Sequence, residues 1–487
     1  MGTYMYGGDM ATQRSRVDDL VVVVPGILGS RLADADGKEV WGLSGKALLR
    51  GIRTFGKSVT GLTLQAGLGD GHPEDGVRPA GLMPDLHALP GVGPLVDGYS
   101  GLMGWLEQNF TLRRRQPGDD PRTPVNLVDF AYDWRLSCRY NAERLAERVD
   151  EELGRWRASA PGRAEARVVF VCHSMGGLVT RQYVERGGGA EVTRRVITLG
   201  TPYRGSLDAL LTLVNGLRPG FGPLRLDLTR FARSLPSLHQ LSPDYACLAS
   251  AGTPSLRYAR EVTGLPGVDE ALLKDAALFH SALRESLTGA AYGVEYLPVS
   301  GVLQPTPTTA EPGDDGELSE LFTIEGVNEG GDGRVPRLSG AHIKGVRRPA
   351  YTPWEQHGSL QNNSAVRWAV WGWLTPELPV HRGPEDEGAA PLGVSVPEVL
   401  VEGEACGVEV SVAQDVPGYE ELALSVRVDG GAVGRSLRNR GEGRYSALIA
   451  GLAPGAHRVE VSARHAPGAS VTALVLVVER GEGADGE

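Results

Sequence analysis

The sequence predicts a parallel α/β region followed by a small all-β region. Up to about Thr375, short apolar segments alternate with helical stretches, which is typical of a parallel sheet covered by helices. After Trp373 the pattern changes to short alternating strands separated by turns. A charged segment rich in Pro and Gly, at 377–391, predicts a linker between the two parts. We therefore expect an α/β domain at 18–376 and a β domain at 392–480.

The strands of the expected parallel sheet are short apolar runs, and each is followed by a turn or a helix. The first run, LVVVVPG, is apolar throughout and predicts a strand buried on both faces. A helix with an apolar stripe at Leu145, Val149 and Leu153 follows the second strand, and another helix begins at Met175. The expected strands lie at 20–26, 125–134, 166–174, 194–202 and 293–302.

Two long insertions interrupt this alternation, at 31–124 and 205–290. The first is rich in Gly and Pro and shows few clear elements, whereas the second contains the amphipathic stretches SLDALLTLVNGL and DLTRFARSLPSLHQLSP. Insertions of this length often form lids or binding walls, although packed segments without a function are the alternative. We expect a lid at about 207–290.

The segment from Leu392 to Val478 predicts a small immunoglobulin-like β-sandwich. It contains several alternating strands within fewer than 90 residues. The tetrapeptide VDGG at 428–431 is a hairpin turn signal.

Composition excludes several classes of function. The chain has 49 Lys and Arg against 60 Asp and Glu, a formal charge of −11, and no basic stripe, so we expect no nucleic-acid partner. The four cysteines are far apart and no His/Cys cluster has ligand spacing, so we expect no metal and no other cofactor. Scattered thiols favour a reducing cytoplasm, and the richness in Arg, Ala, Gly and Pro favours a bacterial source.

The N-terminal apolar run also resembles part of a secretory signal, because Arg14 and Arg16 precede it. Asp18 and Asp19 lie directly before the run, however, and a Pro-Gly pair interrupts it. A buried strand followed by a tight turn fits these residues better. The sequence has no apolar run near the roughly 20 residues of a membrane span.

The stretch VVFVCHSMGGLV at 168–179 contains the candidate nucleophile, Ser174. It reads as an apolar strand, then small-x-Ser-x-Gly, then a helix, a pattern that projects the serine hydroxyl from a sharp turn above the sheet edge. The N–H of Met175 and that of Leu28, from the turn after the first strand, are candidate oxyanion donors. Cys172 is the alternative nucleophile, but adjacent strand residues point to opposite faces, so His173 could not serve it as a base. We expect Cys172 to be buried and inert.

A base and an orienting acid follow Ser174 in the order that such a site requires. Asp332 lies in the Gly-rich EGGDGRVP, and His357 lies in WEQHGSLQNN shortly before a final apolar helix. We expect His357 to take the serine proton and Asp332 to hold the imidazole tautomer. The other candidates, which fall in the lid-like insertion or in expected surface loops, are His239, His280, His342, Asp314 and Asp315.

Seven ordered motifs resemble those of the lecithin:cholesterol acyltransferase family of α/β-hydrolases, which includes lysosomal phospholipase A2 and the phospholipid:diacylglycerol acyltransferases. They are VVVVPGILGSRL, FAYDWRLS, CHSMGGLVTRQYV, LGTPYRGS, RSLPSLHQLSP, GDGRVP and EQHGSL. The resemblance covers about 18–375 and implies an α/β-hydrolase fold with a lid. It implies Ser174, Asp332 and His357 as the catalytic triad, with Leu28 and Met175 as the oxyanion donors. It also implies that Asp133, Trp134 and Arg135 support the active site from below, with Arg135 in a buried ion pair.

These observations favour a serine acyl-ester hydrolase of the lipase or phospholipase type, which forms an acyl-enzyme and acts on lipids or other hydrophobic esters. Such a substrate implies transient contact with a membrane surface. An acyltransferase that passes the acyl group to a lipid alcohol is the close alternative. A catalytically silent hydrolase fold whose β-sandwich binds a protein partner is the second alternative, and a membrane-damaging phospholipase targeted by the sandwich is the third.

Overall fold

The structure is a computed structural model that describes residues 14–42, 59–84, 97–218, 227–250, 253–313, 316–341, 346, 349–375, 391–412, 419–431, 434–463 and 466–479. The predicted linker at 377–391 lies outside the described residues except for Pro391, and so do His342, Asp314 and Asp315.

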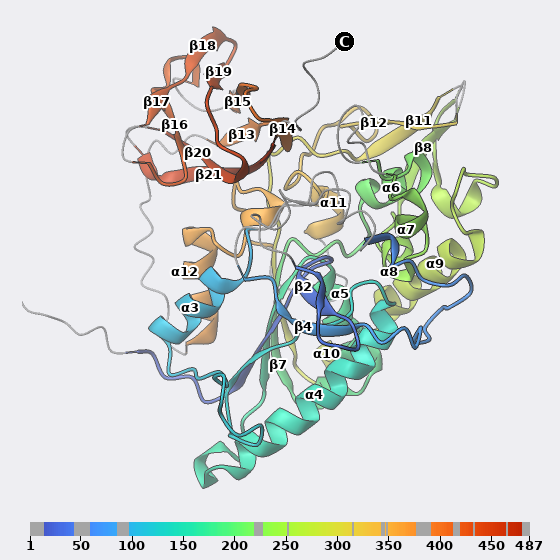
Figure 1. The fold of residues 1–487 in the computed structure, drawn as a ribbon, viewed down its shortest axis with the longest axis vertical. Coiled ribbons are helices and arrows are strands. Elements are labelled where there is room, and N and C mark those ends of the chain that lie inside the picture. The colour runs from blue at the N-terminus through green and yellow to red at the C-terminus, as the bar shows by residue number, and fades with distance from the viewer. Residues whose placement is uncertain are drawn as a thin grey trace, which may run out of the picture.

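A parallel sheet of five strands lies at the centre of the α/β part (Figure 1). Its spatial order is β10-β7-β6-β1-β5, and every neighbouring pair is parallel. The expected strands at 20–26, 166–174, 194–202 and 293–302 are confirmed, with ends moved by a few residues. The five strands are β1 (Leu20–Val24), β5 (Leu127–Asp129), β6 (Val168–His173), β7 (Thr193–Leu199) and β10 (Glu295–Val299).

Helices cover both faces of this sheet, and alternate residues of each strand point to opposite faces. In β1, Val22 and Val24 belong to one apolar cluster with residues of α4 (Cys138–Ala158) and α5 (Met175–Arg186). Val21 and Val23 belong to a second cluster with residues of α3 (Ser100–Asn109) and α12 (Ser364–Leu374). A strand buried on both faces explains why β1 is apolar at every position.

The predicted strand at 125–134 is wrong in its second half, because β5 ends at Asp129. Beyond it the chain turns away from the sheet and contacts Ser30, the residue directly before the first insertion. The Tyr132 N–H donates to the Ser30 hydroxyl at 3.0 Å, and the Trp134 indole donates to the Ser30 carbonyl at 3.1 Å. Helix α4 then begins at Cys138, where the Ser137 side chain caps it by accepting from the Tyr140 N–H.

Both insertions contain more regular structure than the sequence predicts. The first forms a three-stranded sheet of order β3-β2-β4, together with α3. The second contributes helices and two strands of another sheet, whose order is β12-β11-β8-β9. The elements of the first sheet are β2 (Ser30–Ala33), β3 (Glu39–Trp41) and β4 (Arg78–Leu82). The elements of the second insertion are α6 (Leu207–Asn215), α7 (Thr229–Arg233), α8 (Pro236–Gln240), β8 (Ala246–Ser250), β9 (Thr253–Tyr258), α9 (Glu270–Glu285) and, at its end, α10 (Thr288–Ala291). The elements that follow β10 are β11 (Thr309–Pro312), β12 (Leu318–Leu321) and α11 (Arg337–Gly340).

The C-terminal part is a β region of two sheets around one apolar core. One sheet has the order β13-β15-β19-β18, and the other has the order β14-β21-β20-β16-β17; most pairs are antiparallel, but β14 and β21 run parallel. The VDGG turn is present, since Asp429 and Gly430 both have positive φ and the Gly431 N–H donates to the Val428 carbonyl. The strands are β13 (Leu392–Ser395), β14 (Val399–Val401), β15 (Cys406–Val412), β16 (Leu424–Val428), β17 (Arg435–Ser436), β18 (Arg438–Gly441), β19 (Arg444–Ile449), β20 (Gly455–Ala463) and β21 (Ala466–Val478).

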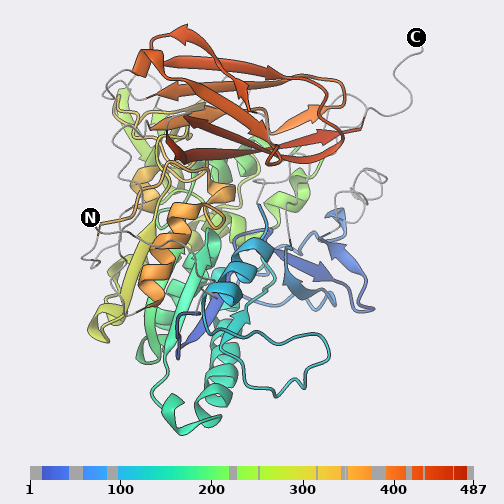
Figure 2. The same cartoon turned by 90° about the vertical axis from the view of Figure 1, so that its left-hand side faces the viewer.

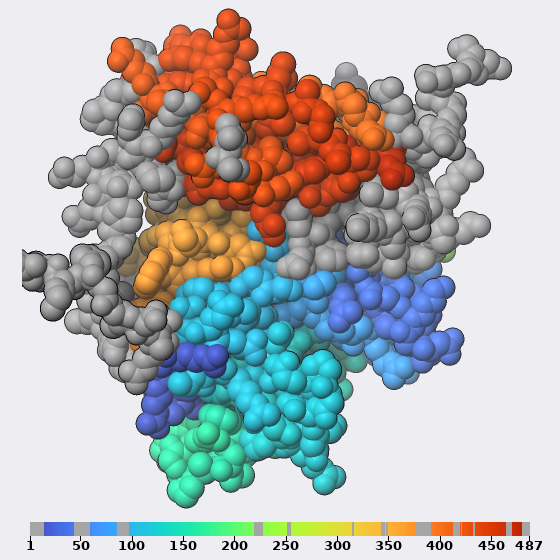
Figure 3. Space-filling view, turned by 60° about the vertical axis from the view of Figure 1, so that its left-hand side comes forward, coloured from blue at the N-terminus to red at the C-terminus, as the bar shows by residue number. Residues whose placement is uncertain are grey.

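The β region lies against one end of the α/β part, over the segments that precede α12 (Figures 2 and 3). Trp354, from the α/β part, packs against the apolar core of the β region. The two parts are therefore joined by side-chain packing as well as by the chain. Within the described ranges, no helix has both the length and the apolar character needed to cross a membrane.

Candidate active site

Ser174 occupies a sharp turn between β6 and α5. Its φ of 51° and ψ of −127° are unusual for a residue with a side chain, and its N–H donates to the Leu199 carbonyl at 2.9 Å. Strain of this kind costs about 1–3 kcal/mol and is concentrated at functional sites. The two following glycines are required for packing, because a Cβ on Gly176 would overlap the Pro25 carbonyl and a Cβ on Gly177 would overlap the Thr201 side chain. The turn holds the Ser174 hydroxyl at the carboxyl end of the parallel sheet.

The structure brings Ser174, His357 and Asp332 together, although they lie far apart in the sequence. His357 Nε2 lies 2.9 Å from Ser174 Oγ, and His357 Nδ1 lies 2.8 Å from Asp332 Oδ2. The other Asp332 oxygen accepts the N–H groups of Arg334 at 3.0 Å and Val335 at 2.7 Å, which fixes the carboxylate plane. All three side chains are buried. With a proton on Nδ1 shared with Asp332, Nε2 is free to accept the serine proton.

Two of the alternative histidines, His239 and His280, lie away from Ser174, and Cys172 is a poor nucleophile. His239 and His280 are buried in the second insertion, where each bonds a backbone carbonyl at 2.9 Å and 2.7 Å respectively, and neither lines the pocket that contains Ser174. Burial raises the pKa of Cys172 to about 12, and its thiol donates to the Thr180 hydroxyl at 3.2 Å. A thiol with that pKa holds almost no thiolate at neutral pH, so it is a poor nucleophile.

The turn after β1 passes beside Ser174 and carries the predicted donor Leu28. Leu28 has a φ of 64°, and its carbonyl accepts the Trp41 indole N–H at 3.1 Å. This bond orients the peptide groups around Leu28, which together with Ile27 lines the pocket that contains Ser174. Met175 is the first residue of α5, where a backbone N–H has no partner within its own helix. Of the two predicted oxyanion donors, Met175 therefore follows Ser174 at the start of α5, and Leu28 lines the same pocket as Ser174.

Sequence reasoning missed a hydrogen-bonded chain that joins three parts of the site. The Gly26 N–H donates to the Tyr99 hydroxyl at 2.9 Å, and that hydroxyl lies 2.8 Å from His173 Nδ1. His173 Nε2 lies 2.9 Å from the His357 carbonyl. Burial, together with the neighbouring His357, lowers the pKa of His173 to about 3, so His173 is neutral. It then donates from Nε2 to His357 and accepts from Tyr99 at Nδ1, which ties the Gly26 turn to the His357 loop.

We expect Tyr99→Phe to lower the free energy of unfolding by about 1–3 kcal/mol, since it leaves a buried N–H and a buried imidazole nitrogen without partners. The change also removes the bond that holds the His173 ring against the Gly26 turn, and His173 in turn bonds the His357 carbonyl. We therefore expect kcat for ester hydrolysis to fall. Urea unfolding with a constant m value measures the first effect. Tyr292→Phe is the matched control, because the Tyr292 hydroxyl bonds Glu191 at the surface. Equal stability of the two variants would contradict the assignment.

An apolar pocket of about 120 Å³ opens beside Ser174 and His357. Its polar rim includes an ion pair in which Arg334 contacts Asp208 at 2.9 Å. The pocket suits the hydrocarbon part of an ester, because burial in such walls removes apolar surface from water. The apolar wall consists of Ile27, Leu28, Pro202, Ala209, Leu217, Phe231, Ala232, Leu235, Leu238, Leu241 and Val335.

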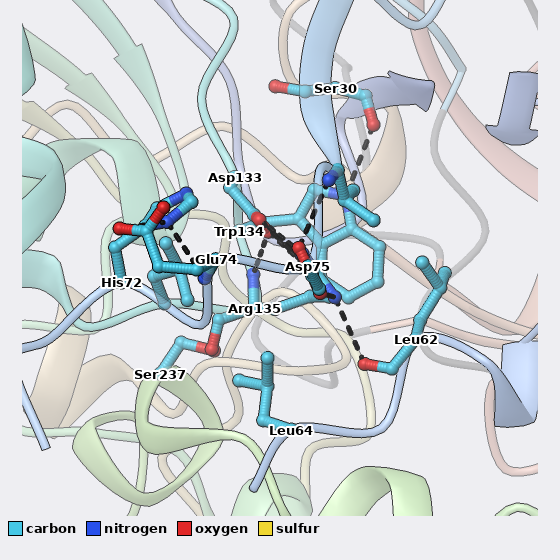
Figure 4. Close-up of polar contacts among 12 residues, drawn as sticks. Ser30, Leu62, Leu64, His72, Glu74, Asp75, Asp133, Trp134, Arg135 and Ser237 are labelled. Carbon is cyan, nitrogen blue, oxygen red and sulfur yellow. Dashed lines mark hydrogen bonds and ion pairs between the residues drawn. The ribbon is translucent and has the colours of Figure 1, made fainter. Parts of the chain in front are cut away.

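Asp133, Trp134 and Arg135 take part in a buried polar network (Figure 4). Arg135 contacts Asp133 at 2.6 Å and Asp75 at 2.8 Å, and it also donates to the Leu62 carbonyl at 3.2 Å. Burial alone would lower the pKa of Arg135, but the two carboxylates outweigh it and raise that pKa. Asp75 and Leu62 belong to the first insertion, so the network anchors that insertion to the loop after β5. None of the side chains of Asp133, Trp134 and Arg135 lines the pocket that contains Ser174.

Asp133→Asn should lower the free energy of unfolding by about 3–5 kcal/mol, because it removes the main partner of a fully buried guanidinium. Asp70→Asn is the control, since Asp70 faces Arg139 at 3.4 Å with half of its side chain exposed. An exposed pair of that kind contributes at most about 1 kcal/mol. Urea titration of both variants checks the difference, and similar losses would show that the Arg135 network is not the stabilising one.

No group of three or more His, Cys, Asp or Glu side chains in the described part of the chain could hold a metal ion.

Comparison with known proteins supports the resemblance stated above. Residues 122–249 match the family model described as lecithin:cholesterol acyltransferase. This segment includes Asp133, Trp134, Arg135 and Ser174, whereas Asp332 and His357 lie beyond it. A search of curated proteins finds no significant match.

The solved structures that are similar to the chain include the following two. One is described as the crystal structure of the Tle4–Tli4 complex, with a TM-score of 0.49 and 14% identity, and it covers 74% of this chain and 98% of its own. The other is the Bacillus licheniformis lipase BlEst2 in mature form, with a TM-score of 0.35 and 13% identity, covering 76% of this chain and 96% of its own.

Proposed function

We propose that this α/β-hydrolase, which is similar to the lecithin:cholesterol acyltransferase family, is a serine acyl-ester hydrolase of the lipase or phospholipase type. The observation that carries the proposal is the position of His357. It bridges the Ser174 hydroxyl at 2.9 Å and the Asp332 carboxylate at 2.8 Å, at the edge of an apolar pocket. A nucleophile, a base and an orienting acid in this relation are the parts that acyl transfer needs.

In the first half of the reaction, His357 Nε2 takes the proton of Ser174 as Oγ attacks the ester carbonyl carbon. The Leu28 and Met175 N–H groups stabilise the oxyanion that develops on the carbonyl oxygen. The tetrahedral intermediate then breaks its bond to the alcohol oxygen, which receives the proton from His357 and leaves. Asp332 remains ionised throughout and stabilises the imidazolium.

In the second half, a water molecule attacks the acyl-enzyme while His357 accepts its proton. Collapse of this intermediate breaks the bond to Ser174 Oγ, which takes the proton back, and a carboxylic acid is released. The apolar pocket holds the acyl chain during both halves. Its walls come partly from α6, α7 and α8, so we assign the lid to this insertion, at about 207–290, and expect it to contact the lipid surface.

Product analysis tests the reaction. Purified protein and Ser174→Ala are incubated with phospholipid vesicles, with and without a neutral-lipid alcohol. Free fatty acid and lysophospholipid from the wild type alone would support a phospholipase, whereas an acylated alcohol formed at the expense of fatty acid would support a transferase. If a soluble short-chain ester is cleaved but neither lipid product appears, the lipid assignment is wrong. If no ester is cleaved, the silent binding protein becomes the better proposal.

Two further expectations belong to this proposal. We assign an immunoglobulin-like sandwich to the C-terminal β region, because its two sheets enclose one apolar core. We also assign the protein to a reducing cytoplasm, because its four cysteines are free and buried.

A further inference from the structure

A single glutamine links the β region to the loop that carries Asp332. The Gln304 side chain is buried, and its amide donates to the Leu392 carbonyl and accepts the Val394 N–H, both at 3.0 Å. These are backbone groups of β13. The backbone N–H of Gln304 donates to the Gly331 carbonyl at 3.0 Å, directly before Asp332. Gln304 therefore connects β13, the first strand of the β region, to the residue directly before Asp332.

The two residues before His357 link the β region to the base in the same way. Glu355 Oε1 accepts the Thr472 N–H of β21 at 2.8 Å, and the Gln356 side chain donates to the Val394 carbonyl of β13 at 3.0 Å. Glu355 also accepts the Gln356 N–H at 2.9 Å and the Asn363 side-chain amide at 3.0 Å. The buried Glu355 carboxylate thus joins the His357 loop, α12 and β21.

Further contacts surround these two links. Arg458 of β20 donates to Asp97 at 2.7 Å, and the Asp97 N–H donates to the Gly358 carbonyl, next to His357, at 2.8 Å. Arg334, two residues after Asp332, forms an ion pair with Glu398 of the β region. A cavity of about 150 Å³ at this junction is lined by residues of both parts, including Asp332 and His357. Figure 3 shows the β region seated on the segment that contains α12.

We propose that the C-terminal β region is part of the active-site scaffold, and that Gln304 and Glu355 are positioning residues that transmit its support to Asp332 and His357. The inference rests on the proposed function, since it assigns these residues to the geometry of that same site. The two links act on different members of the Asp332–His357 pair, whose separation must be held within a fraction of an ångström for proton transfer. The β region meets this need because its strands offer rigid backbone groups.

Gln304→Met tests the first link, because methionine has a similar size but neither bonding group. Glu355→Gln tests the Glu355 network by removing the charge and one acceptor: its oxygen can still accept the Thr472 and Gln356 N–H groups, but its NH₂ group would face the Asn363 amide. In Glu355→Gln with Asn363→Asp, donor and acceptor exchange places, so the bond between these side chains is restored. Val426→Ala is the control for stability, since Val426 is buried in the β-region core away from these contacts. Thermal unfolding of every variant shows that it is folded.

With a soluble short-chain ester, we expect Gln304→Met and Glu355→Gln to lower kcat at least about tenfold with KM nearly unchanged, because the loss lies in geometry rather than substrate binding. The exchange variant should recover most of the loss, and Val426→Ala should unfold at a lower temperature with wild-type kcat. Folded Gln304→Met and Glu355→Gln with wild-type kcat would overturn the inference.

The pH dependence separates positioning from a purely steric role. Burial raises the pKa of Glu355 to about 7, and neighbouring Asp97 adds to this effect. Protonation removes an acceptor from the Glu355 link, so the wild type becomes more like Glu355→Gln as pH falls. The ratio of their kcat values should be greatest above pH 7 and shrink below it, while a constant ratio would argue against the link. The other charged or titratable groups of this neighbourhood are His357, two residues along the chain, Arg458, which donates to Asp97, and Arg367, whose pKa burial lowers and Asp97 partly raises; both proteins contain them.

A readout that needs no turnover distinguishes failure of this inference from failure of the proposed function. We expect the His357 Nδ1 proton, which lies between His357 and Asp332 in a bond of 2.8 Å, to give a downfield proton resonance that His357→Gln removes. We expect Gln304→Met to shift or broaden it and Val426→Ala to leave it unchanged. An unaltered resonance in folded Gln304→Met overturns the positioning role, whatever esters the wild type cleaves. Absence of ester cleavage with a perturbed resonance would instead reject the proposed function alone.

Discussion

Ser174→Ala should abolish ester hydrolysis, lowering kcat by about a million-fold, because the covalent route through the acyl-enzyme is lost. The expected loss is this large because His357 and Asp332 act only through the serine hydroxyl. Measurement of kcat with a soluble ester checks it, and unfolding by urea shows that the variant keeps its fold. Ser281→Ala, at a partly exposed position of α9 where the hydroxyl bonds Glu285, should behave as the wild type. Residual activity above about a hundredth of the wild type would show that another residue is the nucleophile.

Asp332→Asn should lower kcat by about ten-thousandfold with little change in KM, since an amide in this position favours the wrong imidazole tautomer. The side-chain NH₂ group of the substituted residue would donate to His357 Nδ1, leaving the ring proton on Nε2, which could then not accept the proton of Ser174. The fold should be retained, because the remaining carbonyl oxygen can still accept the Arg334 and Val335 N–H groups.

A kinetic profile of Asp332→Asn across pH, compared with the wild type, provides the measurement. A loss of less than tenfold would mean that Asp332 does not orient the base. The contrast with Asp133→Asn is informative, because that variant should lose stability rather than intrinsic rate. Asp332 and Asp133 lie in two of the seven sequence motifs, and the two variants thus compare the loss of a catalytic group with the loss of a stabilising one.

The sequence predicts the central sheet well because its strands are buried on both faces. Uninterrupted apolar runs such as Leu20–Val24 and Val168–His173 have few other stable structures. The candidate residues Ser174, Asp332 and His357 can be predicted because each lies in a local pattern, and their order along the chain restricts the choice. Their proximity in the structure follows from strands that all end at the same edge of the sheet.

The contacts around those residues could not be predicted, because they depend on how distant segments pack. Tyr99 lies in an insertion without a clear pattern, and only the folded chain brings its hydroxyl to His173. Gln304 and Glu355 resemble ordinary polar loop residues in the sequence, and their burial depends on where the β region docks. The early end of β5 has a similar cause, because Tyr132 and Trp134 form hydrogen bonds with Ser30 instead of continuing the strand.

Covalent capture of Ser174 is the measurement that tests the central claim most directly. The purified chain is treated with a fluorophosphonate, which reacts with activated serines, and the labelled peptide is identified by mass spectrometry. We predict one adduct on Ser174, none in Ser174→Ala, and much slower labelling in His357→Gln. A folded wild-type protein that takes up no label, or that carries it on a different residue, would contradict the account.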